Sequence, residues 1–394
     1  MTSIGFVNKE VPTTTKTNDR LLWLDGLRGL IMVLMAIDHA SYFVAKVHWG
    51  EFWGLPIPDY GTGAAFLTRF VTHICAPGFF FVMGIGMMLF ANGRYNLGWS
   101  NGRVARHFAI RGALLILFQN ILENPTWLIG DLLNPVNIGD PPGGGSSVII
   151  HLGVLFSLGA SLIIWGLLLR ANLTVTLIIS FVAIIIPQIF VPTLTSTSTL
   201  YSPLLLLTTL PAHTNILQVY YPILPWLGMA GIGVAFGKLL LRDAERAYKT
   251  ALFTGIIALI LFVVLRLLGG FGNFHPPQND TWISFLSVTK YPPSLTYILL
   301  MMGTLLLLVY LFAHADAWLG RWGKPLLIFG KVPLFFYIVH LYLYLIIGLL
   351  FPSGTGTLMI YVTWLLGLVI LYPLCLWYGH FKQSKAPDSI WRFF

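Results

Sequence analysis

Apolar stretches of about 20 residues follow one another along this chain of 394 residues. A helix of about 20 apolar residues crosses the hydrocarbon core of a lipid bilayer and satisfies its own backbone hydrogen bonds there. Hydrophobic residues make up 57% of the chain and charged residues only 9%, which excludes a soluble globular protein. We therefore predict an all-α polytopic membrane protein with about ten transmembrane helices, at about 21–43, 64–91, 104–123, 148–169, 173–192, 220–239, 250–268, 293–314, 327–350 and 357–378.

The lysine and arginine residues outside these segments gather on alternate connections. With the N-terminus inside, the outer loops carry only Lys46 and Lys290. Cytoplasmic loops are enriched in lysine and arginine, so both termini are predicted to be cytoplasmic. The same asymmetry accounts for the formal net charge of +9 without nucleic acid as a partner. The basic residues of the cytoplasmic side are Lys9, Lys16, Arg20, Arg94, Arg103, Arg106, Arg170, Lys238, Arg242, Arg246, Lys249, Arg321, Lys324, Lys382, Lys385 and Arg392.

The connections between the apolar segments are too short to fold by themselves. We predict a single transmembrane domain at 21–378, with a cytoplasmic N-terminal tail (1–20) and a cytoplasmic C-terminal tail (379–394). The two cysteines, Cys75 and Cys375, lie in separate apolar segments, so they offer neither a disulfide framework nor the spacing of metal ligands. We expect no metal site.

The first apolar segment contains four ionisable residues, Asp25, Arg28, Asp38 and His39, in "LDGLRGLIMVLMAIDHA" (24–40). A charge near the middle of a bilayer costs about 2.5–3.5 kcal/mol on insertion scales, so these groups need either polar partners or a functional role. Arg28 and His39 are eleven residues apart, which puts them on nearly the same helix face, roughly 16 Å apart along the axis. Asp25 and Arg28 fit either a structural ion pair or a binding site, whereas His39 can exchange a proton near neutral pH.

The second apolar segment contains "TRFVTHICAPGFFFVMG" (68–84), in which Arg69 and His73 are four residues apart on one helix face. Pro77 is expected to interrupt the helix just beyond them. A broken helix beside a membrane histidine is typical of a cavity wall. His73 is therefore a second candidate base, with a core histidine bonded to a carbonyl as the alternative.

Further polar residues lie at compatible depths on other segments. His48 is in the first outer loop, Tyr337 and His340 are three residues apart on the ninth segment, and Lys290 precedes the eighth. Gln119, Glu123 and Asn124 close the third segment. Together these groups exceed what helix packing requires, so we predict a polar interior.

Six segments, in this order, resemble a known family: "RLLWLDGLRGLIMVLMAIDHA", "FLTRFVTHICAPGFFFVMGIGMML", "ENPTW", "LPWLGMAGIGVAFGK", "KYPPSL" and "FGKVPLFFYIVHLYLY". They extend from about 20 to 345 and resemble the bacterial branch of the heparan-alpha-glucosaminide N-acetyltransferase catalytic-domain-like family, within the transmembrane acyltransferase superfamily. The resemblance implies an enzyme of the bacterial cytoplasmic (inner) membrane that takes acetyl-CoA from the cytoplasm. Its acetyl group would pass through the bundle to an amine or hydroxyl of a saccharide on the outer face. The lysosomal relative also suggests a homodimer.

Two comparisons bear on which histidine is the base. In the related membrane sugar O-acetylases, "LDGLRG" is followed by a histidine at the spacing that separates Arg28 from His39. In the lysosomal enzyme the position of His39 is asparagine, that of His73 is aspartate, and the catalytic histidine lies in the first outer loop. The only histidine of that loop here is His48.

The resemblance assigns roles to the residues singled out above. His39 is the expected general base, with His73 as the alternative or an orienting partner. Asp38 would hold an imidazole in its useful tautomer, and since it points about 100° away from His39 we expect it to serve a histidine of another helix. Acetyl-CoA would be bound by Asp25, Arg28, Arg94, Arg103 and Arg106. The acceptor would be bound by His48, Arg69, Glu123, Asn124, Lys290, Tyr337 and His340.

Two other functions are compatible with a polar membrane interior. A proton-coupled small-solute transporter would use the same buried histidines and acids to bind and release protons. Binding of acyl-CoA from the inner side would distinguish the enzyme from this transporter. A membrane scaffold that has lost activity would use these residues for stability alone, so substitutions of Arg28 and His39 would change stability and nothing else.

Overall fold

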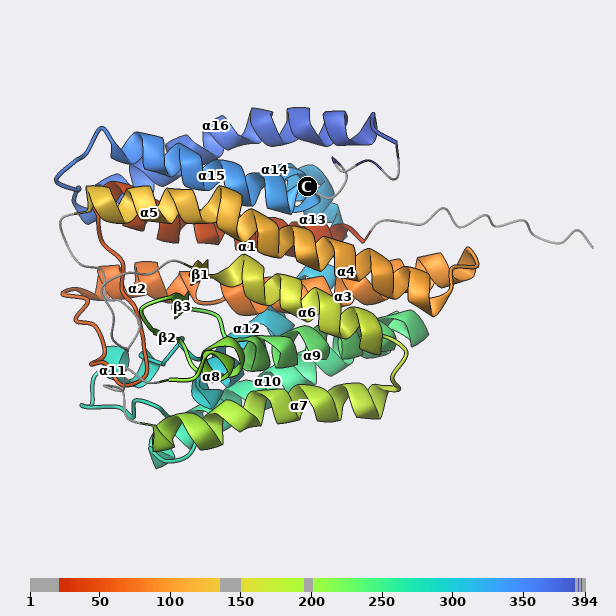
Figure 1. Ribbon diagram of the computed structural model, residues 1–394, viewed down its shortest axis with the longest axis horizontal. Helices are drawn as coiled ribbons and strands as arrows, with labels where there is room; N and C mark the ends of the chain where they lie inside the picture. Colours follow the sequence, from red (N-terminus) through yellow and green to blue (C-terminus); the bar gives the residue numbers. More distant parts are fainter. Residues whose placement is uncertain (1–20, 135–149, 195–200, 387–388, 390, 392–394) are drawn as a thin grey trace, which may run out of the picture.

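The computed structural model describes residues 21–134, 150–194, 201–386, 389 and 391. Long helices lie side by side along its longest axis (Figure 1). In chain order the helices are α1 (Leu22–Ala40), η1 (Ser41–Ala45), α2 (Gly63–Thr72), α3 (Cys75–Asn96), α4 (Asn101–Phe118), η2 (Gln119–Glu123), α5 (Asn124–Leu133), α6 (Val154–Leu168), α7 (Leu173–Phe190), η3 (Val191–Thr193), α8 (Pro203–Thr208), α9 (Ile223–Arg242), α10 (Ala244–Leu268), α11 (Trp282–Leu286), α12 (Leu295–Ala313), α13 (Asp316–Arg321), α14 (Lys324–Lys331), α15 (Pro333–Gly348) and α16 (Thr357–Gln383).

Seven helical segments of the described chain are long and apolar enough to cross a membrane, and the bent pair of α14 and α15 makes an eighth. This confirms the predicted all-α membrane protein. Two other predicted segments coincide with helices outside this set. Helix α4 carries three arginines, Arg103, Arg106 and Arg111, and α6 is only 15 residues long.

A small three-stranded sheet was not predicted. Strand β1 (Ile150–Leu152) pairs in parallel with β3 (Leu217–Val219), and β2 (Ala212–His213) pairs with β3 in antiparallel. The predicted apolar segment at 148–169 is therefore not helical throughout, because residues 150–152 pair with a distant strand and the helix begins at Val154. We call the end of the bundle with this sheet the strand end, and the opposite end, where α1 begins and α16 ends, the terminal end (Figure 1).

The second predicted segment is broken beside His73. Helix α2 ends at Thr72 and α3 begins at Cys75, so the break lies at His73 and Ile74. Pro77 lies in the first turn of α3, where a helix has no use for the missing backbone N–H. The break agrees with the expectation that Pro77 interrupts the helix, because a proline cannot donate to the carbonyl four residues earlier, which here is that of His73. This carbonyl accepts from the Tyr297 hydroxyl (2.7 Å) instead.

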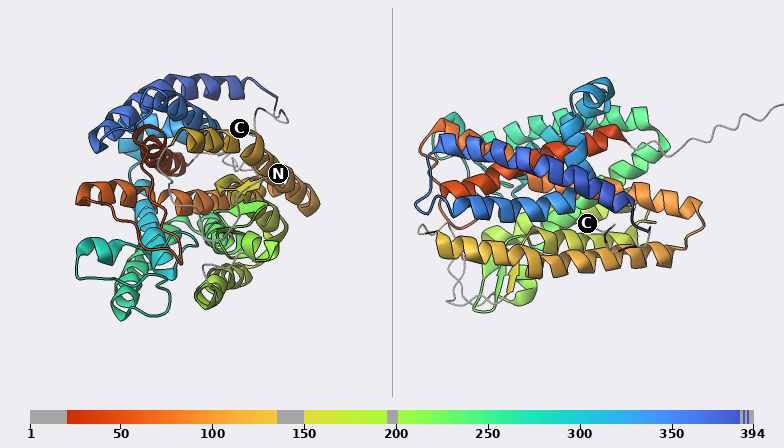
Figure 2. Two further views of the ribbon diagram at one scale, coloured as in Figure 1. Left: turned by 60° about the vertical axis from the view of Figure 1, so that its left-hand side comes forward. Right: turned by 90° about the horizontal axis from the view of Figure 1, so that it is seen from above.

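Helices α14 and α15 meet at an angle of 96°, with Pro333 at the start of α15. Helix α14 crosses α1 closely, since a Cβ on Gly330 would collide with the carbonyl of Asp25. In the left-hand view of Figure 2, α16 covers one face of the bundle and α7 and α10 lie at the opposite face. Helix α1 is enclosed between these layers, and 72% of its most apolar part is buried.

Helix α16 continues to Gln383, so the last helix enters the predicted C-terminal tail (379–394). The predicted N-terminal tail (1–20) lies outside the described residues.

Candidate active site

A cavity of ≈ 430 Å³ opens into the strand end of the bundle. We call it the histidine cavity, because His39, His48 and His151 line it. Its other polar lining residues are Asp38, Tyr42, Thr72, Gln119, Glu123, Asn124, Asp131, Asn134, Tyr220, Tyr221, Lys290, Tyr291 and Tyr337. They come from α1, η1, α2, η2, α5 and α15 and from the connections between helices, so the tertiary fold brings together segments that are far apart in the sequence.

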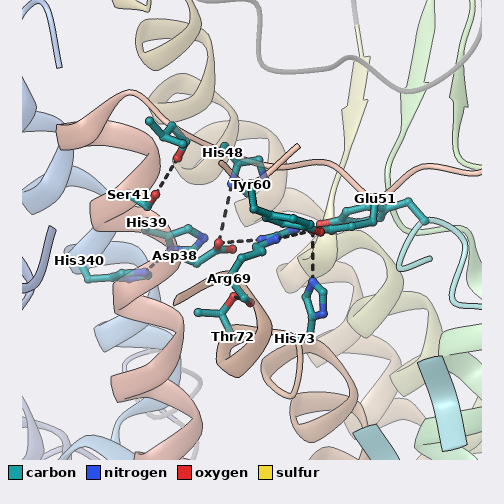
Figure 3. A network of polar contacts seen from close by, with 12 residues as sticks. Asp38, His39, Ser41, His48, Glu51, Tyr60, Arg69, Thr72, His73 and His340 are labelled. Atoms are coloured by element: carbon teal, nitrogen blue, oxygen red, sulfur yellow. Dashed lines mark hydrogen bonds and ion pairs between the residues drawn. The ribbon is translucent and has the colours of Figure 1, made fainter. Parts of the chain in front are cut away.

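A buried arginine connects two carboxylates beside this cavity. The Arg69 side chain on α2 donates from Nε to Glu51 Oε1 (2.9 Å) and from Nη2 to Glu51 Oε2 (2.8 Å). Its Nη1 donates to Asp38 Oδ1 at 2.6 Å. Figure 3 shows Arg69 lying between the two acids. Arg69 is 2% exposed and Glu51 0%, so this fork of charge-assisted hydrogen bonds compensates charges that have lost their water.

Glu51 also links two connections, the one between η1 and α2, in which it lies, and the one that precedes α12. Its Oε1 accepts from the Tyr60 hydroxyl at 3.2 Å and lies 3.3 Å from His73 Nε2. Its backbone carbonyl accepts from the backbone N–H groups of Lys290 (3.1 Å) and Tyr291 (3.0 Å). Burial alone would raise the pKa of Glu51, but Arg69 outweighs it and holds this pKa well below its ordinary value. The side chain of Glu51 thus fixes this residue on Arg69, and its backbone carbonyl holds Lys290 in the cavity wall.

Asp38 faces a histidine other than its neighbour in the helix. Its Oδ1 lies 3.8 Å from His48 Nδ1, and its closest partner is Arg69. The histidine lies in the connection after η1, not on another helix as predicted, because this connection folds back over the end of α1. Burial lowers the pKa of His48 from its ordinary 6.5 to about 4, although Asp38 acts in the opposite direction. His48 is therefore neutral at pH 7.

His39 and His340 form a pair inside the bundle. His39 Nδ1 lies 2.5 Å from His340 Nε2, and His340 Nδ1 lies 2.9 Å from the carbonyl oxygen of Phe336. Because a carbonyl only accepts, His340 Nδ1 carries the hydrogen, and with both rings neutral His340 Nε2 accepts from His39 Nδ1. This tautomer leaves the lone pair of His39 on Nε2. His39 itself lines the histidine cavity, so the ring that the pair orients is the one available for chemistry.

A second cavity, of ≈ 390 Å³, continues toward the terminal end. We call it the basic cavity, because Arg28, Arg111, Lys331 and Lys382 line it among apolar side chains. The Arg28 guanidinium donates to Asp25 Oδ1 at 3.2 Å and to the Gly330 carbonyl at 3.1 Å. The predicted pairing of Asp25 with Arg28 is present, and it holds Arg28 at the wall of this cavity.

The predicted site residues fall into four groups. Asp38, His39, His48, Glu123, Asn124, Lys290 and Tyr337 line the histidine cavity. Arg69, His73 and His340 lie behind its wall and contact lining residues or Glu51. Asp25 and Arg28 belong to the basic cavity. The predicted Arg94, Arg103 and Arg106 line neither of these cavities.

Two of the three arginines outside the cavities lie over aromatic rings. Arg94 lies over the rings of Phe90 (4.8 Å) and Trp99 (5.0 Å), and Arg103 lies 4.1 Å from the Trp99 ring centroid. These contacts place the two guanidinium groups at the turn between α3 and α4.

Sequence reasoning missed Glu51, Arg111, Lys331, Lys382 and Asp131. Arg111 and Lys331 lie inside predicted apolar segments, so the rule that singled out Arg28 would also have found them. Glu51 and Asp131 lie in or beside connections, where an acidic residue is ordinary and carries no signal. Their place at the cavity depends on how these connections fold over the bundle.

Comparison with known proteins gives one family. The family model described as "Heparan-alpha-glucosaminide N-acetyltransferase, catalytic" matches residues 20–268, which is more than half of the chain. No curated protein matches it. The matched part includes His39, His48, Glu51 and Arg69, whereas Tyr337 and His340 follow it. The chain belongs to the heparan-alpha-glucosaminide N-acetyltransferase catalytic family, and this membership indicates a membrane acetyltransferase.

Proposed function

We propose that this protein transfers an acetyl group from acetyl-CoA, bound at the terminal end, to an amine or hydroxyl of a saccharide at the strand end. In this proposal the chain crosses the bacterial inner membrane about ten times, with both termini in the cytoplasm. The observation that carries it is the succession of two cavities along the bundle, one with four basic residues and one with histidines and carboxylates.

The basic cavity fits the donor. Arginine and lysine side chains bind the phosphates of a nucleotide by charge-assisted hydrogen bonds, and Arg28, Arg111, Lys331 and Lys382 supply four such cations. The apolar side chains around them, such as Met32 and Leu114, suit an uncharged pantetheine arm. Asp25 positions Arg28 in this proposal and does not contact the donor.

The histidine cavity fits the transfer itself. Nε2 of His39 accepts the proton of the acceptor as the acceptor nitrogen or oxygen attacks the thioester carbonyl carbon. The new C–N or C–O bond forms and the C–S bond breaks. The sulfur of CoA leaves as a thiolate, which the imidazolium of His39 protonates. Glu123 and Asn124 contact the acceptor, and Lys290 stabilises the oxyanion.

His48 is the second candidate base, because it lines the same cavity and faces Asp38. His73 is a weaker candidate, because it lies against Glu51 behind the cavity wall and is 1% exposed.

The test is transfer of labelled acetyl from acetyl-CoA to a panel of amino sugars and glycans by the purified protein in liposomes. We expect His39→Ala to lower the rate about 10²–10⁴-fold, the usual contribution of a general base. His314→Ala is the matched control, since His314 is exposed at the end of α12 and should be dispensable. A loss in His48→Ala with retention in His39→Ala would assign the base to His48.

A transporter remains the second candidate function, because two cavities in series and a bent helix pair also suit alternating access. The same liposomes separate the two functions. Acetyl transfer that requires acetyl-CoA supports the enzyme. Absence of both transfer and saturable acetyl-CoA binding, together with solute flux across the membrane, would overturn the proposal in favour of a transporter.

A further inference from the structure

The histidine cavity and the basic cavity share part of their walls. Among the described residues, Phe79, Val154 and Tyr337 line both. They come from three helices, α3, α6 and α15, so they stand around the boundary between the two cavities. We call these three residues the neck.

We propose that the neck selects the acyl group by size, admitting the acetyl group and excluding acyl chains of six carbons. This inference rests on the proposed function, because it concerns which thioesters that reaction accepts. It adds the specificity-determining residues, which neither the family match nor the sequence identifies.

The neck lies directly beside the candidate base. The ring centroids of Tyr337 and His39 are 6.4 Å apart, and those of Tyr337 and His340 are 5.7 Å apart. A thioester whose carbonyl carbon is at His39 therefore has its pantetheine arm in the neck, and its acyl group has already passed through. Every acyl group must cross the same boundary, whatever acceptor is bound on the far side.

Contacts outside the cavities fix the three neck residues in position. The start of α6, at Val154, is fixed because Gln119 Oε1 accepts from the backbone N–H groups of Leu155 (3.1 Å) and Phe156 (3.4 Å). Phe79 follows Gly78, whose Cα packs against Ile31 of α1 so closely that a Cβ would lie 2.6 Å from Ile31 Cδ1.

Tyr337, the third neck residue, is also fixed by its neighbours. It lies one turn before His340 on α15 and shares its face, and His340 is bonded to His39. Tyr337 is 6% exposed and faces the Glu123 carboxylate. A packed interior resists expansion, so an opening with walls fixed on three sides discriminates against larger groups by steric exclusion.

The test widens and narrows the neck and measures kcat/KM for acetyl-CoA, butyryl-CoA and hexanoyl-CoA. We expect Val154→Ala and Phe79→Ala to lower the preference for acetyl over hexanoyl about tenfold or more, the usual effect of a change of pocket size. Val154→Phe should slow all three donors. The ratio of two donors does not depend on the fraction of folded protein, so a loss of stability does not disturb the comparison.

Leu158→Ala is the matched control. Leu158 lies one turn after Val154 on α6 and lines the basic cavity but not the histidine cavity. Its substitution removes a similar volume away from the neck, so the acetyl preference should stay as in the wild type.

Two results would overturn the neck while leaving the proposed function intact. One is a wild-type protein that transfers hexanoyl as fast as acetyl. The other is an acetyl preference that is unchanged in both widened variants or that Leu158→Ala lowers equally. A wild-type protein that transfers no acetyl group would instead overturn the proposed function, and the neck with it.

Discussion

Arg69 compensates the negative charges of two carboxylates at the site. It is buried between Asp38 and Glu51, and its planar guanidinium contacts both carboxylates at once. A lysine has a single ammonium group and cannot reproduce the fork. Arg69→Lys should therefore leave one buried acid without compensation and destabilise the protein by about 3–5 kcal/mol. Thermal unfolding in detergent measures this.

An exposed ion pair provides the contrast. Lys249 and Glu245 on α10 are 3.3 Å apart with both side chains 62% exposed. Exposed pairs contribute about 0–1 kcal/mol, so Glu245→Ala should hardly change the unfolding temperature. Equal effects of Arg69→Lys and Glu245→Ala would contradict the assigned role of Arg69.

His48 should make stability depend on pH. Burial lowers its pKa from 6.5 to about 4 in the folded protein. Between these values the unfolded chain binds a proton on this histidine and the folded protein does not, so the free energy of unfolding falls as the pH drops from about 6.5 to about 4. Above pH 6.5 neither state binds this proton, so His48 no longer makes the free energy of unfolding depend on pH. His48→Gln cannot titrate, and its unfolding temperature should fall less steeply over this interval.

His314→Gln is the matched variant for the pH series. His314 is exposed at the end of α12, so this variant makes the same substitution outside the buried connection that holds His48. A profile of His48→Gln that is parallel to the wild type would show that His48 is not buried as a neutral ring.

At the scale of elements, the contact between α1 and α14 sets the position of Arg28. The Gly330 carbonyl accepts from Arg28, and a Cβ on Gly330 would collide with the carbonyl of Asp25. Gly330→Ala should push α14 away from α1, lower the unfolding temperature and raise the KM for acetyl-CoA. In the matched variant Gly320→Ala, the added Cβ meets no heavy atom within 4 Å among the described residues, so both quantities should stay unchanged.

The helices and strands also show which elements can be predicted from local sequence patterns and which cannot. The apolar segments were predicted closely, because twenty apolar residues in a row leave a membrane helix as the main option. The break beside His73 was also predicted, because Pro77 removes the hydrogen bond to the His73 carbonyl. The strand β1 was not predicted, because it has no local cause: β1 exists because β3 lies beside it.

At the scale of the whole molecule, the position of the cavities separates two sets of arginines. Arg28 lines the basic cavity, whereas Arg94 and Arg103 lie over aromatic rings outside both cavities. A hydrogen bond to a charged group contributes about 1.5–3 kcal/mol, so Arg28→Ala should raise the KM for acetyl-CoA about tenfold or more. Arg94→Ala and Arg103→Ala should leave this KM near the wild-type value. A larger effect of the latter two variants would move the donor site to the turn between α3 and α4.

The amino-acid sequence is enough to predict the class of the protein and to identify residues that need a partner or a functional role. Hydrophobicity and the cost of charge in a bilayer are properties of single segments, so they predict the membrane helices and single out Arg28 and His39. Which of the polar groups meet depends on the tertiary fold. His39 and His340 are 301 residues apart, and Glu51 reaches Arg69 because a connection without regular pattern folds over the bundle. Such contacts depend on how helices pack and connections close, and no local period in the sequence encodes them.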